Sequence, residues 1–535
     1  MDTLRGMSAS GGGLSLRRGL WVAAVVVGGG ATAWTQSAPS KGTPAKGETT
    51  PPVLQSGQTT VTADTLLTKA QETQLLADMS STFQWVSKDT GLEIKRPIKG
   101  RFETRDDVSK MLRKKFDDDK DAKRMQRDEL VLKKFGLIDR DFHMRQFLLS
   151  LLTEQIAGFY DNKTQEMTLL DWVPMDQQEP VMAHELTHAL QDQRVGLTKW
   201  GDQEPEGVAK DVAEDARHIQ TDETDTAREA VLEGQAMVSY ADYLLKPTGK
   251  TLKDMPQVGD QLRNSAGDMG DSPVLARAPL LLQQALLFPY TAGLDFEQYV
   301  LVKKGTDRAF AGVLDNPPSS SFEIMQPDRY LANTPVPVMR MPDIHPMLTE
   351  AGYEPYDIGV MGELDVRITA ELFGGRPLAE ALAPNWDGGI YYAAQRKSAT
   401  AAEKETTASL ALLYDSQWKN EDSAQSFFTV FEEELPRQYD GLVRRQKDEV
   451  DGFERVYTTR EGDVLLTLEG NRVWVSEGFD VALARKLRDT VDSVQGSGRM
   501  QSAERQGTGN SGQGTELVGG LSGWLGSFGM VLPRR

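Results

Sequence analysis

The chain has 535 residues, of which 39% are hydrophobic and 26% are charged, and its formal net charge is −19. This length allows two or three domains, and the composition is that of a globular protein rather than of a disordered or membrane-embedded chain. The acidic balance argues against a nucleic-acid partner, and the lack of cysteine excludes disulfide bonds, thiolate metal ligands and cysteine nucleophiles.

The first segment, residues 1–33, has the pattern of a signal peptide. Basic residues precede an apolar core at 20–27, and Ala31-Thr-Ala33 suits signal peptidase. The core is short for a transmembrane helix, so we expect an extracytoplasmic protein, periplasmic or secreted. We expect no stable membrane insertion after cleavage, and an uncleaved anchor is the alternative. Residues 34–60 are rich in Ser, Pro, Thr, Gly and Lys and are predicted to be a flexible linker.

Residues 61–350 are predicted to form the main domain. Hydrophobic spacing predicts a helix over 62–90 and an apolar helix over 147–156, and the dense mixed charges of 103–137 predict an exposed helix pair. Residues 156–170 have the pattern of a β-hairpin. Its free edge could pair with an extended peptide, and a purely structural hairpin is the alternative.

A metal-binding pattern follows the hairpin in the stretch Val181-Met-Ala-His-Glu-Leu-Thr-His-Ala-Leu190. Residues four apart share one face of a helix, so His184 and His188 can direct two imidazoles at one metal ion. Glu185 is then placed beside the metal, where it can take a proton from water. Pro180 is predicted to begin the helix. The alternative is an ordinary helix face that carries two histidines.

The third metal ligand must be His, Asp or Glu because the chain has no cysteine. Residues 226–240 are predicted to form a second helix with a mostly apolar face, which Glu233 interrupts. A buried carboxylate needs a partner, so Glu233 is the preferred ligand and Glu229 the competitor. Gly234 is unfavourable inside a helix and indicates a close approach to another segment.

These residues, His184-Glu185-x-x-His188 followed by Glu233-Gly-x-Ala, resemble the gluzincin metallopeptidases, the thermolysin and aminopeptidase N group. The resemblance implies a zincin-like fold, one zinc ion per chain and a Glu ligand on the next major helix. The interval from His188 to Glu233 is longer than in that group, and an acidic insert at 201–225 would account for the extra length.

The resemblance also implies a Tyr or His beside the metal that stabilises the oxyanion. Tyr290 is the preferred residue, with Tyr240, His218 and His345 as alternatives and a core tyrosine as the competing interpretation. Asp192, four residues after His188, could orient that histidine or be an exposed residue at the end of the helix.

A closer resemblance is to a bacterial family of extracytoplasmic H-E-x-x-H proteins, and it covers roughly residues 100–350. That family often has a histidine near the position of Gln326, so the glutamine here argues against an essential ligand at this site. The matching stretches are Ala157-Gly-Phe-Tyr-Asp161, Ala183-His-Glu-Leu-Thr-His-Ala-Leu-Gln-Asp192, Leu232-Glu-Gly-Gln-Ala236, Phe288-Pro-Tyr-Thr-Ala-Gly293 and Asn316-Pro-Pro-Ser-Ser320.

The remaining chain is predicted to hold one more helix of the main domain and a second domain. A helix over 278–287 is expected to end at Pro289. Residues 351–495 are predicted to be a smaller α+β domain, and residues 496–535 a disordered tail rich in Gly and Ser. The expected helices are 362–373 and 423–435, and the expected strands are 453–459, 464–468 and 472–476.

Together these patterns predict an α+β protein with a mainly helical zincin-like domain and a small sheet. The expected function is zinc-dependent hydrolysis of peptide or protein substrates, with His184, His188 and Glu233 on the metal and Glu185 as general base. Two alternatives are a zinc hydrolase for other substrates and an inactive or scaffold protein with a structural zinc site.

Overall fold

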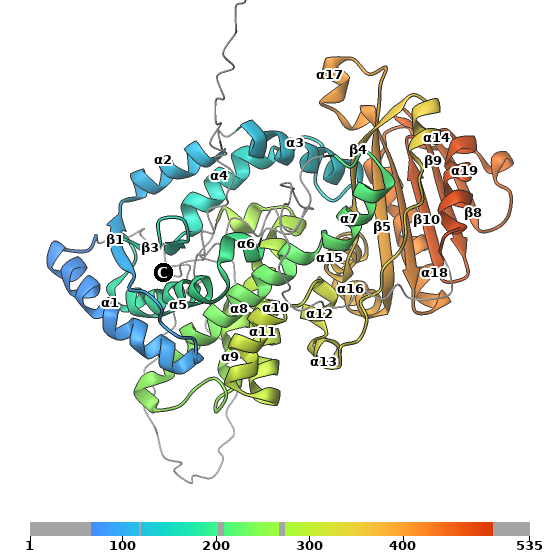
Figure 1. The fold of residues 1–535 in the computed structure, drawn as a ribbon. Helices are drawn as coiled ribbons and strands as arrows, with labels where there is room; N and C mark the ends of the chain where they lie inside the picture. Colours follow the sequence, from blue (N-terminus) through green and yellow to red (C-terminus); the bar gives the residue numbers. More distant parts are fainter. Residues whose placement is uncertain (1–65, 117–118, 202–207, 267–272, 496–535) are drawn as a thin grey trace, which may run out of the picture.

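The architecture is α+β, with a mainly helical region followed along the chain by a large antiparallel sheet (Figure 1). This agrees with the predicted fold class at that level. The computed structural model describes residues 66–116, 119–201, 208–266 and 273–495.

Helices make up most of the chain before the large sheet. The predicted helices over 62–90, 147–156 and 226–240 are confirmed as the first, fourth and eighth of them, within the described residues. The α-helices are α1 (Lys69–Thr90), α2 (Arg105–Phe116), α3 (Asp119–Lys134), α4 (Met144–Gln155), α5 (Met175–Val195), α6 (Leu197–Gly201), α7 (Val212–Thr221), α8 (Thr224–Leu245), α9 (Gln257–Ala266), α10 (Leu280–Lys304), α11 (Val313–Asp315), α12 (Ser321–Met325), α13 (Pro327–Leu331) and α14 (His345–Glu350).

The ends of α1 show how local sequence sets its limits. The Thr68 side chain and Gln71 form a reciprocal capping box at the start, and Gly91 ends the helix at a φ of 70°. The predicted exposed pair is present as α2 and α3, but α3 is not exposed throughout. Leu130 and Lys134 near its end are only 5% and 1% exposed, because this turn packs under the large sheet.

A three-stranded sheet precedes the metal-binding pattern. The predicted hairpin is confirmed as β2 (Gly158–Asp161) and β3 (Glu166–Leu170), joined by a turn in which Gln165 has a φ of 59°. The sequence patterns missed β1 (Lys99–Glu103), which pairs with β3 in parallel. The strand order is β1-β3-β2, so β2 forms an edge of this sheet.

Helix α5 begins at Met175, so the prediction that it begins at Pro180 is wrong. Pro174 occupies the N-cap, and Pro180 lies inside the helix. A proline near the start of a helix removes one hydrogen bond and leaves the following turns intact. The Gln178 side chain donates to the carbonyls of Leu170 and Val173, both at 2.9 Å, and so fastens the first turn to the end of β3.

Helix α10 continues through Pro289, so the prediction that it ends there is also wrong. It runs along α8, and the two backbones touch where they cross. A Cβ atom placed on Gly234 of α8 would lie 2.2 Å from the Gly293 carbonyl oxygen of α10, and one on Gly293 would lie 2.2 Å from the Ala230 carbonyl oxygen. Packing against α8 therefore keeps the chain helical beyond the proline, and Gly234 has the close neighbour that the sequence indicated.

The large sheet has seven strands in the order β4-β5-β6-β10-β9-β8-β7, all antiparallel. The predicted strands β8, β9 and β10 and the predicted helices α15 and α18 are confirmed, whereas β4, β5 and β6 were missed. The elements are β4 (Tyr353–Val360), α15 (Glu363–Gly374), α16 (Arg376–Leu382), β5 (Trp386–Arg396), α17 (Ala401–Lys404), β6 (Leu410–Trp418), α18 (Glu421–Gln438), β7 (Val443–Arg444), β8 (Glu454–Thr459), β9 (Gly462–Glu469), β10 (Arg472–Glu477) and α19 (Val481–Asp492).

Both faces of this sheet are covered. Alternate residues of β10 point to opposite faces, so Val473 and Val475 join the core that contains α18, and Trp474 joins the core that contains α19. The first of these cores extends into the helical region. Phe135 packs edge-on against Tyr391 and Tyr414, with ring centroids 5.5 Å and 6.0 Å apart. The predicted domain boundary at residue 350 stays a prediction.

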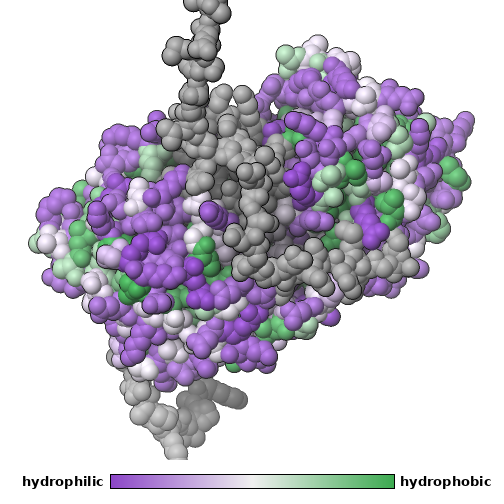
Figure 2. Space-filling model, viewed as in Figure 1, coloured by the Kyte–Doolittle hydropathy of each residue, from purple (hydrophilic) through white to green (hydrophobic). Residues whose placement is uncertain are grey.

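The predicted signal peptide, linker and C-terminal tail lie outside the described residues. Within the described part, no helix combines the length and the apolar character needed to cross a membrane. On the face shown in Figure 2, hydrophilic side chains predominate among the described residues, and hydrophobic ones are scattered between them.

Candidate metal centre

The two histidines lie on the buried middle of α5. Every residue from Pro180 to Gln193 is buried, and the exposed fractions of His184 and His188 are 0% and 3%. Their rings are 4.8 Å apart between centroids, as expected for two residues one helical turn apart on a shared face. The helix therefore holds both imidazoles inside the protein, where each polar atom needs a partner.

Helix α8 brings Glu233 to the same place. It packs across α5 on one side and against α10 on the other. The crossing at Gly234 and Gly293 brings the backbones of α8 and α10 into contact. The Glu233 Oε2 atom lies 3.1 Å from the Nε2 atom of His184 and 3.5 Å from that of His188. The two Nε2 atoms are themselves 3.1 Å apart. Three side chains that the sequence pattern proposed as ligands are thus brought together.

These three atoms fit a metal ion. Among the described residues, His184, His188 and Glu233 are the group of potential ligands that could hold one, and all three are buried. Tetrahedral coordination at bond lengths of about 2.0–2.1 Å places neighbouring ligand atoms about 3.3 Å apart. The observed separations of 3.1, 3.1 and 3.5 Å lie close to that value. Two nitrogens and one carboxylate oxygen also form a donor set that suits zinc and related divalent metals.

The electrostatics of the cluster favour its metal-binding protonation states. Burial lowers the pKa of His184 to about 4, with the Glu233 hydrogen bond opposing that effect, so the imidazole is neutral near pH 7. Burial acts to raise the pKa of Glu233, but His188 and His184 more than offset it and the net shift is downward. A neutral imidazole and an ionised carboxylate are the forms that coordinate a metal ion.

Glu185 lies in the same interior and does not belong to the ligand group. Its exposed fraction is 0%, and the backbone of Tyr160 is a hydrogen-bonding neighbour of its carboxylate. Burial first, and the nearby charge of Glu233 second, raise its pKa well above the ordinary value, while the Tyr160 backbone opposes them. A cation beside the cluster would favour the ionised form and oppose this shift.

Edge strand β2 lies directly beside Glu185. A Cβ atom placed on Gly158 would be 3.5 Å from Cγ of Glu185 and 3.0 Å from Val181 Cγ1, so the strand backbone runs close along α5. The contact between β2 and α5 is therefore made through a residue without a side chain. It brings an edge of the small sheet next to the carboxylate that the sequence proposed as the base.

Gln191 orients His188, and the sequence patterns did not identify it. The Nδ1 atom of His188 lies 2.8 Å from Oε1 of Gln191, so Nδ1–H donates to the amide oxygen and leaves Nε2 free to bind. The Gln191 amide nitrogen donates to the Leu232 carbonyl and to Gln235 Oε1, both at 3.0 Å. Gln191 lies three residues after His188 on the same helix, and this spacing could have indicated a contact between the two side chains.

Gln235 continues this chain of hydrogen bonds into a turn of π-helix. Its amide nitrogen donates to the carbonyls of Ala309 and Phe310 at 2.8 Å and 3.1 Å, within the π-helix η3 (Arg308–Gly312). A π-turn leaves carbonyl groups free to accept such bonds. The orientation of His188 is therefore fixed by residues that lie far apart in the sequence.

Asp192 has a different role from the one considered for it. Its carboxylate accepts hydrogen bonds from the Arg96 guanidinium at 2.6 Å, the Tyr160 hydroxyl at 3.0 Å and the Leu197 N–H at 3.0 Å. Asp192 is buried and ties the end of α5 to β2 through Tyr160. It is therefore neither the acceptor for His188 nor an exposed residue at the helix end.

The other residues proposed from the sequence occupy several places. Glu229 is buried on α8, one turn before Glu233, and does not belong to the ligand group. Tyr290 is 3% exposed within α10, three residues before the crossing at Gly293, and its role as a catalytic residue stays a prediction. His345 lies 3.3 Å from Asp215 and packs against Tyr392 of the large sheet, and it does not belong to the ligand group.

No protein-family model matches this chain, and comparisons with curated proteins and with solved structures find no match either.

Proposed function

We propose that this chain is a zinc-dependent peptidase of the gluzincin type that acts outside the cytoplasm of a bacterial cell. The observation that carries the proposal is the convergence of His184, His188 and Glu233, with Glu185 buried next to them. A purely structural zinc site is normally closed by four protein ligands, whereas a catalytic site has three and leaves one position for water or substrate. The ligand group found among the described residues has three members.

The order of elements supports a zincin-like arrangement. A small sheet comes first, then the helix with both histidines, then a helix with the carboxylate ligand. This is the order that the resemblance to gluzincins implied, with α7 lying in the longer interval between the two helices. The proposal therefore includes the zincin-like fold for the helical region.

Each side chain would have a defined part in peptide hydrolysis. A bound zinc ion supplies Lewis-acid chemistry, polarising a carbonyl group and making water a nucleophile near neutral pH. Glu185 takes the proton from the attacking water and passes it to the leaving amine. Gln191 keeps His188 in the tautomer that binds through Nε2.

Edge strand β2 would hold the substrate. An extended peptide can add to the free edge of a sheet by backbone hydrogen bonds, and this mode of capture does not depend on side-chain sequence. The close approach of Gly158 to Glu185 would place such a peptide next to the proposed base. Tyr290 is proposed as the residue that stabilises the oxyanion.

The test compares the purified full-length protein with Glu185→Gln and His184→Ala. Bound metal is measured by elemental analysis, and hydrolysis is measured on an unfolded protein, with and without chelator. We expect about one zinc per chain in the wild type and in Glu185→Gln, and none in His184→Ala. We expect cleavage only in the wild type without chelator, with a loss of about 100-fold or more in Glu185→Gln.

The two alternatives give different results in the same assay. Hydrolysis of small esters or amides without cleavage of peptides would indicate a zinc hydrolase for other substrates. Bound zinc with no hydrolysis that is sensitive to chelator would indicate a structural site. If Glu185→Gln kept both metal and full activity, the role given to this residue would be wrong.

A further inference from the structure

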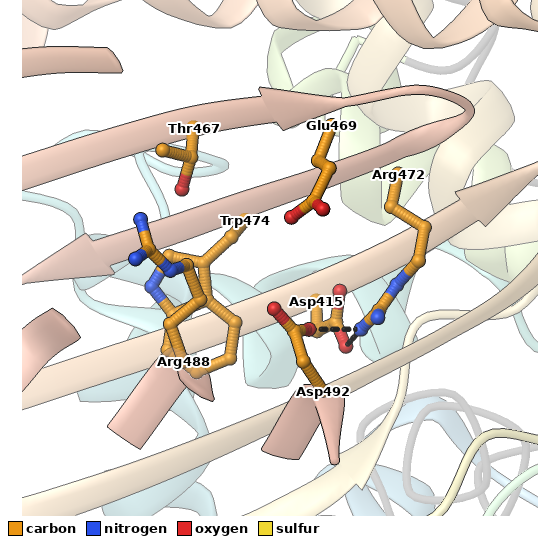
Figure 3. Close-up of a pocket in the computed structure, with 7 residues that line it drawn as sticks. All are labelled: Asp415, Thr467, Glu469, Arg472, Trp474, Arg488 and Asp492. Carbon is orange, nitrogen blue, oxygen red and sulfur yellow. Dashed lines mark hydrogen bonds and ion pairs between the residues drawn. The ribbon is translucent and has the colours of Figure 1, made fainter. Parts of the chain in front are cut away.

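A polar cavity of about 310 Å³ lies on the large sheet and shares no residue with the histidine cluster (Figure 3). Side chains from three neighbouring strands, β6, β10 and β9, form one side of the cavity. Trp474 of β10 pairs with Asp415 of β6 on one side and with Thr467 of β9 on the other, so these three side chains form a row. Arg472, two residues before Trp474 on β10, pairs with Glu469 of β9. Side chains two apart on a strand share a face, so Arg472 and Glu469 lie on the same face as this row.

Helix α19 supplies the remaining wall. Arg488 and Asp492 are four residues apart and point back toward the sheet from one face of the helix (Figure 3). Asp492 lies 2.7 Å from the Arg472 guanidinium, which also pairs with Asp415. Arg488 and Trp474 both line the cavity (Figure 3). Strands and a helix therefore hold charged groups of both signs around one space.

Several buried polar atoms in this wall have no hydrogen-bond partner among the described residues. Asp415 and Trp474 are 1% and 3% exposed, and neither Oδ1 of the aspartate nor Nε1 of the indole has one. The same holds for Thr467 Oγ1 and Arg472 Nε. Buried polar groups in native proteins are nearly always hydrogen-bonded, to protein or to other molecules, so these atoms are the groups that a molecule in the cavity would contact.

The wall specifies what that molecule must offer. The Oδ2 atom of Asp415 already accepts from Arg472, so its Oδ1 atom is the one that can take a further donor. The indole N–H of Trp474 can only donate and needs an acceptor. Glu469 adds a second anionic group, and Arg488, which also pairs with Glu454 and Asp489, adds a cationic one. A ligand with a cation and an anion a few bonds apart would satisfy both kinds of group, and the volume lies at the small end of ligand pockets.

We propose that this cavity binds a small zwitterion of the free α-amino-acid class. The ammonium group lies against Asp415 and Glu469, and the carboxylate accepts from the Trp474 N–H beside Arg488. This binding site is independent of the metal centre and does not rest on the proposed peptidase activity.

The test is calorimetric titration of the full-length protein with glycine, L-leucine, L-lysine and L-glutamate, and with methylamine and acetate as half-ligands. We expect saturable binding of at least one amino acid at one site per chain, and binding at least about tenfold weaker for both half-ligands. Trp474→Phe removes the N–H donor and keeps an aromatic ring, and it should weaken binding by about tenfold or more. Glu469→Gln should weaken it too, and Glu405→Gln, an exposed residue outside the cavity, should not.

The outcomes separate clearly. No binding of any amino acid, or binding that Trp474→Phe and Glu469→Gln leave unchanged, would overturn the proposal. If Trp474→Phe does not fold, Glu469→Gln decides alone, since this side chain is exposed and its loss leaves the core intact. The titration is repeated with chelator and with His184→Ala. Unchanged binding is expected, and loss of binding would place the amino acid at the metal centre instead.

Discussion

Replacing Gly234 with alanine tests how the crossing of α8 and α10 positions the metal centre. The added Cβ would lie 2.2 Å from the Gly293 carbonyl oxygen and 2.5 Å from its carbonyl carbon. Ordinary contact needs about 3.5 Å, so the helices would have to separate by about 1 Å. Both atoms belong to the backbone, and no side-chain rotation can relieve the overlap.

The expected cost follows from two opposing effects. Alanine is favoured over glycine inside a helix by about 1 kcal/mol. Overpacking a tight contact costs typically about 1–3 kcal/mol and sometimes more, and a clash between two backbones belongs at the upper end. We therefore expect a net destabilisation of about 2 kcal/mol. Because Glu233 is the preceding residue, a shift of α8 also moves a ligand, and zinc affinity should fall about tenfold or more.

The assay is denaturant unfolding followed by tryptophan fluorescence, together with competition for zinc against a chromophoric chelator. Gly259→Ala is the matched control, because it also lies inside a helix. Its added Cβ would meet Oε1 of Gln298, the far end of a flexible side chain that can move away. We expect a stability change within about 1 kcal/mol for that control and unchanged zinc affinity. A Gly234→Ala protein with wild-type midpoint and wild-type zinc affinity would refute this account of the crossing.

Two further predictions concern the hydrogen bonds of the centre and the buried acids. Gln191→Ala should lower zinc affinity by about 10–100-fold in the chelator competition, because it removes the acceptor of His188. Gln193→Ala is the control, because the Gln193 side chain accepts from the Lys95 backbone N–H, and this variant should leave the zinc affinity unchanged. Equal losses of zinc affinity in both variants would count against the role of Gln191. Burial raises the pKa of Asp365 from 3.8 to about 7, so the stability this carboxyl contributes is complete below its unfolded pKa and is lost as pH rises through 7. The unfolding midpoint of chelator-treated protein should therefore fall between about pH 4 and pH 7 and fall less in Asp365→Asn, and a difference between the two proteins of the opposite sign over this range would contradict the reasoning.

The sequence was sufficient for features that depend on local periodicity and chemistry. The H-E-x-x-H spacing determined that His184 and His188 would share one helix face, because four residues make about one turn. The predicted hairpin before this helix and the three consecutive strands near the end of the chain were also confirmed, since alternation and turn residues mark such strands. Glu233 was identified because a carboxylate on an apolar helix face needs a partner.

Features that depend on contacts between distant segments required the tertiary structure. Pro289 did not end α10, because packing along α8 kept the chain helical where the local signal predicted a stop. The partner of His188 is Gln191 rather than Asp192, because the Asp192 carboxylate accepts hydrogen bonds from the Arg96 guanidinium and the Tyr160 hydroxyl. Helix propensity and spacing carry no information about which distant group reaches a side chain. The distance between Glu233 and the two histidines is likewise set by the packing of α8 against α5, which local sequence does not encode.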